Sequence, residues 1–333
     1  MIIYLRAETY PNEYRVPLVP HDIKTLISQG HRVYVQSSQA RYIPDSEYTA
    51  VGAEITKSPW WEQSSHTLII GLKTLDSIQN LNKHTHIYFS HSYRGQDTAK
   101  TILTAFAQSS SKLYDLEYFH TPEGIRVLAF GLYAGQVGAA LGLRQHYNRS
   151  HGHPDIQGLK PWPTHDEMME FCKSAEPRIL IIGNGRCAQG VKDIMEAKKL
   201  PYTIIGKNTQ PNLAEYDIVF NCILLDPEYN NIWIKSTDII EKPKPLLIVD
   251  ISCDYSKPNN PIAIYNTGTT FQTPVYNYNN ISIIAIDNLP SLLPRESSTE
   301  FSNRLTDLLL RYEDPCWKAN LATYYRQHGL QNL

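Results

Sequence analysis

The sequence contains no apolar run long enough to cross a bilayer, which takes about 20 predominantly apolar residues. It also lacks any long block of like charges, and its formal net charge is −2. These absences predict a chain that neither spans a membrane nor attracts nucleic acid through an excess of positive charge. Residues 1–6 show no basic segment leading into an apolar stretch, so we expect a cytoplasmic protein without an export signal.

Cysteine is scarce and is not arranged in C-x-x-C pairs. The five cysteines are Cys172, Cys187, Cys222, Cys253 and Cys316. An odd number without an export signal predicts buried thiols. Cys187 and Cys222 have a second interpretation, because each follows an expected strand and thiols that meet at one sheet edge can form a redox-sensitive pair.

Acidic or cysteine ligands that would complete a metal site are also missing. His84 and His86 form a His-x-His pair, which suits zinc only when further ligands accompany it. We therefore predict no metal ion.

What the sequence does have is a regular alternation of short apolar runs and helical patterns, which predicts an α/β fold with parallel sheets. Its 333 residues and 42% hydrophobic content suffice for two domains with separate cores. The first half has expected strands at 1–5, 31–36, 66–72, 86–89 and 112–114, and helices at 20–29 and 96–107. A long helix at 129–147, a loop at 148–163 and a short helix at 165–173 lead into the second half.

An apolar run breaks into glycines at 178–190 (RILIIGNGRCAQG), where a strand would turn into a helix over 191–199. Gly183 to Ala188 fit the pattern G-x-G-x-x-A. Gly183 would permit a tight turn, Gly185 would let the backbone approach a pyrophosphate, and Ala188 would let helix and strand pack closely. The pattern predicts a dinucleotide site, and a turn without a ligand is the alternative.

Further strands are expected over 201–205, 216–225 and 245–252, as a doubly wound sheet requires. In NAD-binding sheets an acid about 20 residues after the glycine motif holds the ribose hydroxyls. Here the second strand ends in Gly206, Lys207 and Asn208. Lys207 is therefore either an exposed lysine or a residue that favours the 2′-phosphate of NADP.

Many short segments carry a family resemblance when they are taken in order. They are LRAET at 5–9 with Arg15, IIGLK at 69–73, FSHSY at 89–93, LYDLE at 113–117, FGLYAG at 130–135, GRC at 185–187, NCI at 221–223, VDIS at 249–252 and IDNLPSLLPRE at 286–296. On these segments the chain resembles the lysine-forming saccharopine dehydrogenases of the alanine dehydrogenase and transhydrogenase superfamily. The resemblance implies two Rossmann-like domains with an active-site cleft between them: residues 1–130 plus 300–333 for substrate and catalysis, and 131–299 for the dinucleotide.

The resemblance also implies a reaction, the NAD-dependent oxidation of saccharopine to lysine and 2-oxoglutarate through an imine that water attacks. Such chemistry needs one group to deprotonate the secondary ammonium and another to manage water addition and imine collapse. The family's residues for these roles match Lys73 and His91, and Glu117 matches an acid that would sit near the lysine. An exposed strand end for Lys73 and a structural salt bridge for Glu117 are the alternatives.

Saccharopine carries three carboxylates, so we expect arginines in its pocket, and Arg15, Arg94 and Arg126 lie in or beside the resembling segments. Ion pairing within the protein is the alternative for these arginines. The expected cofactor contacts are Gly183, Gly185, Arg186, Cys187, Lys207, Cys222, Tyr133, Asp250, Ser252 and Asp287. For Asp287 the alternative is an N-cap of a helix that begins near Leu289.

Three positions depart from the fungal pattern: Tyr10 replaces a lysine, Thr74 an acid, and Lys207 the ribose-binding acid. We expect NAD as cofactor, with NADP as the alternative, and saccharopine, lysine and 2-oxoglutarate as small-molecule partners of a monomer or small homo-oligomer. Two other functions stay open. One is a dehydrogenase for another N-(carboxyalkyl) amino acid or a small amino acid such as alanine, and the other is a nucleotide sensor without catalysis.

Overall fold

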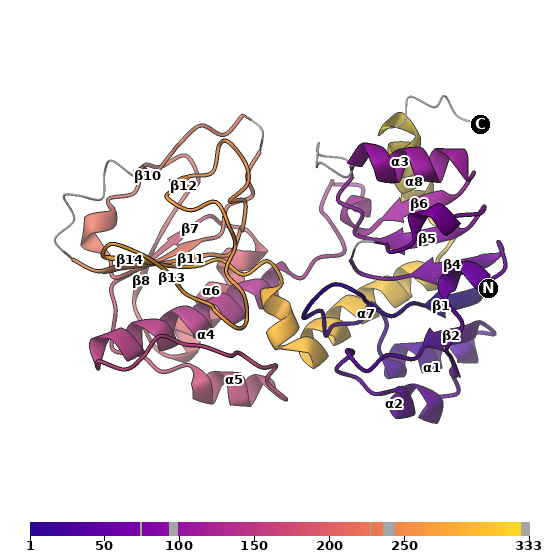
Figure 1. Cartoon of the computed structure of the whole chain (residues 1–333), viewed down its shortest axis with the longest axis horizontal. Coiled ribbons are helices and arrows are strands. Elements are labelled where there is room, and N and C mark those ends of the chain that lie inside the picture. Colours follow the sequence, from indigo (N-terminus) through magenta and orange to yellow (C-terminus); the bar gives the residue numbers. More distant parts are fainter. Residues whose placement is uncertain (74, 93–98, 227, 236–243, 328–333) are drawn as a thin grey trace. The chain divides into compact units, whose positions relative to one another are not determined.

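The computed structural model describes residues 1–73, 75–92, 99–226, 228–235 and 244–327. The chain forms two compact units, one made of Met1–Ala129 together with the C-terminal segment from Pro294, the other of Phe130–Leu293 (Figure 1). Each unit is built on its own six-stranded sheet. The predicted α/β class with parallel sheets is confirmed.

The sheet of the first unit is parallel throughout and has the strand order β3-β2-β1-β4-β5-β6. Its strands are β1 (Ile2–Leu5), β2 (Arg32–Gln36), β3 (Glu54–Thr56), β4 (Thr67–Ile70), β5 (Thr85–Tyr88) and β6 (Lys112–Asp115). This order, 3-2-1-4-5-6, is that of dinucleotide-binding sheets, in which the winding reverses between the first and fourth strands. The carboxyl ends of β1 and β4 therefore border the crevice where such sheets bind ligands.

Helices from both ends of the chain complete the first unit. They are α1 (Pro20–Ser28), α2 (Asp45–Ala50), α3 (Ala99–Gln108), α7 (Pro294–Leu310) and α8 (Pro315–Gln327), with the 3₁₀ turns η1 (Trp60–Glu62), η2 (Ile78–Asn80) and η3 (Leu116–Tyr118). Proline begins α1 and α7, where its fixed φ suits a first helical residue. Ser302 of α7 accepts a hydrogen bond from the backbone N–H of Val19 at 2.9 Å and donates one to Asp22 at 2.5 Å. These bonds fix α7 to the start of α1.

One face of this sheet carries an aromatic cluster that encloses His86. Its imidazole is 1% exposed, and its ring centroid lies 4.9 Å from that of Trp60 and 5.5 Å from that of Phe106. Neither ring nitrogen has a hydrogen-bond partner among the described residues. Burial, with smaller contributions from His84 and Arg6, lowers the pKa of His86 well below 6.5, so the buried ring is neutral.

We predict that His86→Leu removes part of the acid sensitivity of the first unit. A group whose folded-state pKa is depressed binds its proton more readily when the chain is unfolded, so the wild type should lose up to about 1.4 kcal/mol of stability per pH unit as pH falls below 6.5. Leucine has no proton to bind. Denaturant unfolding of both proteins between pH 7.5 and 5 tests this, and equal pH dependence in the two would contradict it.

The sheet of the second unit has the order β13-β14-β11-β9-β7-β8, and only β13 runs antiparallel to its neighbour. The strands are β7 (Ile179–Ile182), β8 (Tyr202–Ile205), β9 (Ile218–Asn221), β11 (Leu246–Asp250), β13 (Tyr276–Tyr278) and β14 (Ile281–Ile284). A separate pair consists of β10 (Ile234–Lys235) and β12 (Ile262–Ala263). Counted along the chain, the parallel strands follow 2-1-3-4-5, so the winding reverses between β7 and β9.

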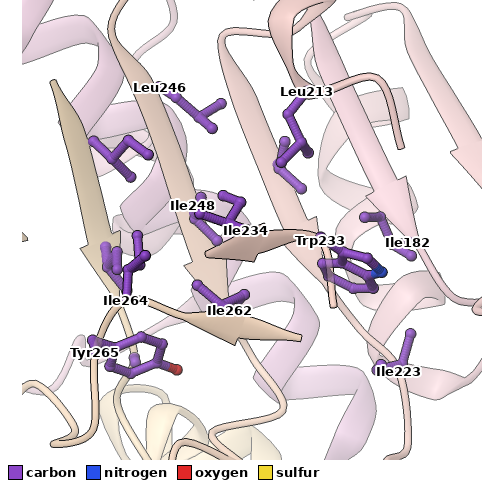
Figure 2. Close-up of a cluster of buried hydrophobic side chains, with 14 of the residues drawn as sticks. Ile182, Leu213, Ile223, Trp233, Ile234, Leu246, Ile248, Ile262, Ile264 and Tyr265 are labelled. Carbon is purple, nitrogen blue, oxygen red and sulfur yellow. The ribbon is translucent and has the colours of Figure 1, made fainter. Parts of the chain in front are cut away.

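The two faces of this sheet are covered differently. The helices are α4 (Gly131–Ser150), α5 (His165–Phe171) and α6 (Arg186–Ala197), with η4 (Leu213–Glu215) and η6 (Leu289–Leu292). Strand residues alternate in direction: Phe220 and Val249 point at Gly142 of α4, whereas Val219 and Ile248 join the opposite cluster. That cluster is closed by Trp233, Ile262 and Tyr265 from the chain around β10 and β12, as Figure 2 shows.

Close contact between α4 and α6 depends on glycine. A Cβ at Gly135 would stand 2.0 Å from the carbonyl oxygen of Cys187, and one at Gly190 would stand 2.0 Å from that of Leu132. Both positions therefore exclude any side chain larger than that of glycine. Two boundaries were wrong: α4 continues to Ser150 into the expected loop, and α6 begins at Arg186, directly at the glycine turn. None of the described helices is both long and apolar enough to cross a membrane.

Candidate active site

Three of the predicted catalytic residues follow three adjacent strands. Lys73 comes after β4, His91 after β5 and Glu117 after β6, and these strands lie side by side in one parallel sheet. Parallel strands end at the same edge, so the fold brings these segments to one side of the first unit. The residues that follow β1, Arg6 and Glu8, reach the same edge.

The backbone at Lys73 is held by the buried side chains of Arg6 and Glu8. The Glu8 carboxylate accepts the N–H of Leu72 at 2.6 Å and that of Lys73 at 2.9 Å, and the Arg6 guanidinium donates to the Lys73 carbonyl. The Arg6 and Glu8 side chains are 1% and 6% exposed and lie 3.6 Å apart. Burial raises the pKa of Glu8, while Arg6 and the two N–H groups oppose that rise. Sequence reasoning missed this pair, although both residues lie in the LRAET segment.

The Lys73 side chain lies against Tyr10. Its ammonium nitrogen is 4.8 Å from the centre of the Tyr10 ring, within the range of a cation–π contact. Tyr10 is one of the three departures from the fungal pattern, so the departure adjoins the predicted catalytic lysine. A second departure, Thr74, lies outside the described residues.

His91 has a left-handed backbone conformation, with φ of 51°. Such a φ is uncommon outside glycine and often marks a functional position. The ring stacks on Phe89, with centroids 6.2 Å apart, and its Nδ1 lies 4.0 Å from Oε1 of Glu117. Arg126 donates a hydrogen bond to the same Glu117 oxygen at 3.4 Å. Its guanidinium carbon also lies 5.4 Å from the centre of the Phe89 ring, on which His91 stacks. His91, Glu117 and Arg126 thus form one cluster.

A buried carboxyl group, Asp115, ties this cluster to the sheet. One oxygen accepts a hydrogen bond from Ser90 Oγ at 2.6 Å, and the other accepts the N–H of Glu117 at 2.8 Å. Asn320 of α8 brackets the Asp115 backbone, accepting its N–H at 3.1 Å and donating to its carbonyl at 2.8 Å. Burial raises the pKa of Asp115 to about 6, although Ser90 and the Glu117 N–H oppose the rise.

The predicted substrate-binding arginines have different environments. Arg15 is 5% exposed and makes a bidentate pair with Glu13, at 2.7 and 2.6 Å. Arg126 belongs to the His91 cluster and also donates to the carbonyl of Leu128 at 2.7 Å. Arg94 lies outside the described residues.

In the second unit the glycine turn has the shape that a dinucleotide pyrophosphate needs. Gly183 has φ of 116°, and a Cβ there would stand 2.8 Å from the carbonyl oxygen of Cys222, so only glycine fits. Gly185 is the N-cap of α6, and a Cβ placed on it would meet no atom within 4 Å. The turn therefore leaves open space at the N-terminus of a 12-residue helix, which suits an anion. Ala188, in the first turn of α6, is fully buried.

Arg186 and Cys187 form the first turn of α6, and Tyr133 lies in the first turn of α4. Cys222 follows β9, and its N–H donates to the carbonyl of Ile182 at the end of β7. Burial, with a contribution from nearby Cys187, raises the pKa of the Cys222 thiol well above its usual value. Both cysteines are thiols and not halves of a disulfide.

Asp250 at the end of β11 is 1% exposed, and its carboxylate is bonded within the protein. It accepts the side-chain N–H of Asn221 at 2.8 Å and the backbone N–H groups of Ser252 and Cys253 at 3.1 and 3.2 Å, and Tyr265 donates to its second oxygen. Burial raises its pKa to about 6. These bonds favour a structural role for Asp250 at the strand end.

Two further predicted residues have neighbours that the sequence did not indicate. Asp287 is exposed. Burial raises the pKa of the Tyr255 phenol, and the nearby negative charge of Asp287 raises it further. The alternative that made Asp287 an N-cap was wrong, because Asn288 precedes η6. Lys207 follows β8, and its ammonium donates to Asp226 at 2.5 Å. Asp226 is a residue that sequence reasoning missed.

No group of three or more His, Cys, Asp or Glu side chains in the described ranges is arranged to hold a metal ion. The two histidines that raised the question, His84 and His86, lie edge-on to Trp60 with centroid distances of 5.5 and 4.9 Å. Their ring contacts are those of core aromatic residues.

Two family descriptions match the chain in order: Alanine dehydrogenase/PNT, N-terminal domain, over residues 4–137, and Alanine dehydrogenase/PNT, C-terminal domain, over residues 178–331. A saccharopine dehydrogenase (NAD(+), L-lysine-forming) of Candida glabrata is 35% identical over 350 aligned residues, which cover 95% of this chain and 94% of the relative. The chain belongs to the saccharopine dehydrogenase family. A member from Schizosaccharomyces pombe is 33% identical, with 95% of each chain covered.

Solved structures agree with this family assignment at the level of fold. An L-alanine dehydrogenase has a TM-score of 0.73 at 16% identity and covers 97% of this chain and 94% of its own. A transhydrogenase from Sinorhizobium meliloti has a TM-score of 0.66 at 16% identity, with 96% and 97% covered. At such identities the likeness establishes the architecture that this saccharopine dehydrogenase family member shares with them, and nothing of its substrate.

We predict that Asp115→Ala destabilises the first unit by about 1–3 kcal/mol, because it leaves Ser90 and the Glu117 N–H without their acceptor. Asp115→Asn keeps an acceptor for Glu117 and should cost less. Because the pKa of Asp115 is raised to about 6, wild-type stability from this group is present below about pH 4 and is lost as pH rises through 6.

The advantage of wild type over Asp115→Asn should therefore shrink between pH 4 and 7. Denaturant unfolding of the three proteins across that range measures it. An advantage that grows with pH would contradict the assignment of a raised pKa, and an Asp115→Ala variant as stable as wild type would contradict the role of its hydrogen bonds.

Proposed function

We propose that this chain is an NAD-dependent saccharopine dehydrogenase that oxidises saccharopine to L-lysine and 2-oxoglutarate, and that runs in reverse with the same residues. The observation that carries the proposal is the agreement of two findings. Relatives of that name match 93–95% of the chain at 31–35% identity. The three predicted catalytic residues, Lys73, His91 and Glu117, follow three adjacent strands of one sheet.

Bound NAD would supply the hydride acceptor, and the protein must handle the protons. We assign to Lys73 the removal of the proton from the secondary ammonium of saccharopine, because a neutral amine releases hydride from its carbon more readily. Hydrogen bonds from Arg6 to the Lys73 carbonyl and from the Lys73 N–H to Glu8 fix the backbone from which the flexible side chain extends. The Tyr10 ring limits where the ammonium can go.

We assign to His91 the activation of water that attacks the imine, and the proton transfers that release the amine. Its Nδ1 faces Glu117 at 4.0 Å, so that carboxylate orients the ring for proton transfer from the other nitrogen. Arg126 pairs with the same oxygen of Glu117 and offsets its charge.

The substrate's carboxylates require cations, and we propose Arg126 and Arg15 for two of them. Arg126 is 31% exposed at its side chain and lies in the His91 cluster. Arg15 is more deeply buried, and its pair with Glu13 fixes the plane of the guanidinium. Arg94 remains a predicted third contact outside the described residues.

On the cofactor side, the open space at Gly185 and the N-terminus of α6 would hold the pyrophosphate. Arg186 and Cys187, in the first turn of the same helix, are the predicted neighbours of that group. Ser252 donates to the carbonyl of Ile223 at 2.5 Å and so joins the ends of β11 and β9. Tyr133, Cys222, Asp250 and Asp287 remain predicted contacts or supports of the nicotinamide end.

We propose a cytoplasmic enzyme whose partners are small molecules: saccharopine, lysine and 2-oxoglutarate. All five cysteines are thiols in the structure, as a reducing compartment maintains them. Its division into a catalytic part, residues 1–130 and 300–333, and a dinucleotide part, 131–299, is likewise our proposal.

A related substrate is the second candidate, and one contact favours it. Tyr10 stands on Lys73 where the fungal enzymes carry a lysine, so the environment of the proposed base differs from theirs. Assays at the reduced-nicotinamide absorbance band should compare saccharopine, lysine plus 2-oxoglutarate, and alanine. Turnover with another N-(carboxyalkyl) amino acid and none with saccharopine would replace the proposal by this candidate.

We predict that Lys73→Met and His91→Gln each lower turnover with saccharopine by a factor on the order of 10² to 10⁴, the usual range for losing a general acid or base. Dinucleotide affinity should change little. Matched controls are Lys112→Met and His66→Gln, which alter exposed residues at the amino ends of β6 and β4 in the same sheet. A Lys73 or His91 variant with turnover equal to its control would remove that residue from the mechanism.

A further inference from the structure

A hollow of about 500 Å³ opens at the carboxyl end of β8, and it is lined by Lys207, Asp226, Glu228 and Tyr229 among others. Lys207 comes two residues after the end of β8, and Asp226 comes five residues after the end of β9. In the sheet order β9-β7-β8, the two strands flank β7, whose end carries the glycine turn. The hollow therefore lies beside the turn that would receive a pyrophosphate.

The position of this hollow in the sheet predicts what it faces. In doubly wound sheets the pyrophosphate sits after the first strand of the unit, and the adjoining adenosine ribose is held at the end of the second. The first strand here is β7 and the second is β8. The end of β8 is the place where NAD-binding sheets carry an acid, and this chain has Lys207 there.

Asp226 meets Lys207 in a built arrangement. The Lys207 ammonium donates to Oδ2 of Asp226 at 2.5 Å, and Tyr229 Oη donates to the Lys207 carbonyl at 3.0 Å. Asn259 donates to the carbonyls of Asp226 and Tyr229 at 2.9 and 3.1 Å. The hydrogen bond from Lys207 holds the pKa of Asp226 below its usual value. Both side chains are 44% exposed, so the pair is open to a ligand.

We propose that Asp226 supplies, from the loop after β9, the ribose-binding carboxylate that is missing from the end of β8, and that it makes the chain select NAD over NADP. The inference rests on the proposed function only in taking a nicotinamide dinucleotide as the cofactor. Asp226 accepts hydrogen bonds from the ribose hydroxyls, and its charge offsets that of Lys207.

The charges at the hollow decide against the alternative, in which Lys207 attracts a 2′-phosphate. The ammonium already has a carboxylate partner, and exposed Glu228 adds a second negative charge to the lining. A 2′-phosphate, with nearly two negative charges, would therefore meet two carboxylates and one ammonium. Exposed ion pairs contribute little to folding stability. We therefore expect the pair of Lys207 and Asp226 to affect which ligand binds rather than the stability of the fold.

The test measures dissociation constants of NAD and NADP with the full chain, by calorimetric titration without amino-acid substrate. We expect wild type to bind NAD at least tenfold more tightly than NADP, which equals about 1.4 kcal/mol. Asp226→Asn should reduce that ratio at least tenfold, because it replaces the charged carboxylate by a neutral amide with a single acceptor oxygen and leaves the charge of Lys207 without its counterion. Asp226→Glu, which restores the carboxylate, should recover most of the ratio, and Lys207→Met should maintain or increase it.

The matched control is Asp217→Asn, which breaks the pair of Arg178 and Asp217, 2.8 Å apart, at the amino ends of β7 and β9 in the same sheet. It should leave both affinities unchanged. A ratio that Asp226→Asn alters by less than twofold, or a wild type that prefers NADP, overturns the proposal. So does a ratio that falls equally in the control.

Binding and turnover separate this inference from the proposed function. A chain that binds NAD with the expected ratios but does not oxidise saccharopine refutes the function and supports the role of Asp226. A chain that oxidises saccharopine while Asp226→Asn keeps the wild-type ratio refutes the role of Asp226 alone. A wild type that binds neither dinucleotide refutes both.

Discussion

Buried carboxylates at strand ends are the interaction on which both units depend. When a parallel strand ends, the backbone N–H groups just beyond it lose their ladder partners and must find others. Glu8 takes the N–H groups of Leu72 and Lys73, Asp115 takes that of Glu117, and Asp250 takes those of Ser252 and Cys253. Burial raises the pKa of all three acids. The cost of desolvating each one is offset only because several donors converge on it, and so the chain beyond each strand is held in one conformation.

The buried acids also hold the segments that carry the proposed catalytic residues, although the catalytic side chains take no part in these hydrogen bonds. Lys73 and Glu117 are held through their own backbone N–H groups, and the Ser90 side chain, adjacent to His91, is held by Asp115. A site built this way is set by the sheet, because Lys73 and Glu117 are anchored at their backbone N–H groups.

How much of this was predictable depends on the range of the interaction. The glycine turn and the buried strands were visible because each leaves a local pattern of apolar residues and glycines, and Gly183 has the positive φ that the pattern implied. The bond between Asn320 and Asp115 was not, since it joins residues 205 apart and depends on where α8 packs. The face that Trp233 and Ile262 cover was missed as well, because β10 and β12 are only two residues long and carry no periodicity.

The local electrostatic environment was the least predictable property, because the type of a residue gives its own charge but not the charges that surround it. Arg15 looks in sequence like an unpaired cation, yet Glu13, two residues earlier, already holds it in two hydrogen bonds, so a substrate carboxylate at Arg15 would join an existing ion pair. Lys207 looks like a phosphate ligand until Asp226 is found beside it. In both cases the partner is close enough in the chain to have been considered, but only the course of the backbone decides that the two side chains meet. The charge that a pocket prefers in its ligand therefore depends on ion pairs and not on single residues. At the end of β8, Lys207 alone would suggest an anion site, but Lys207 and Asp226 form a neutral pair with the exposed acid Glu228 beside it.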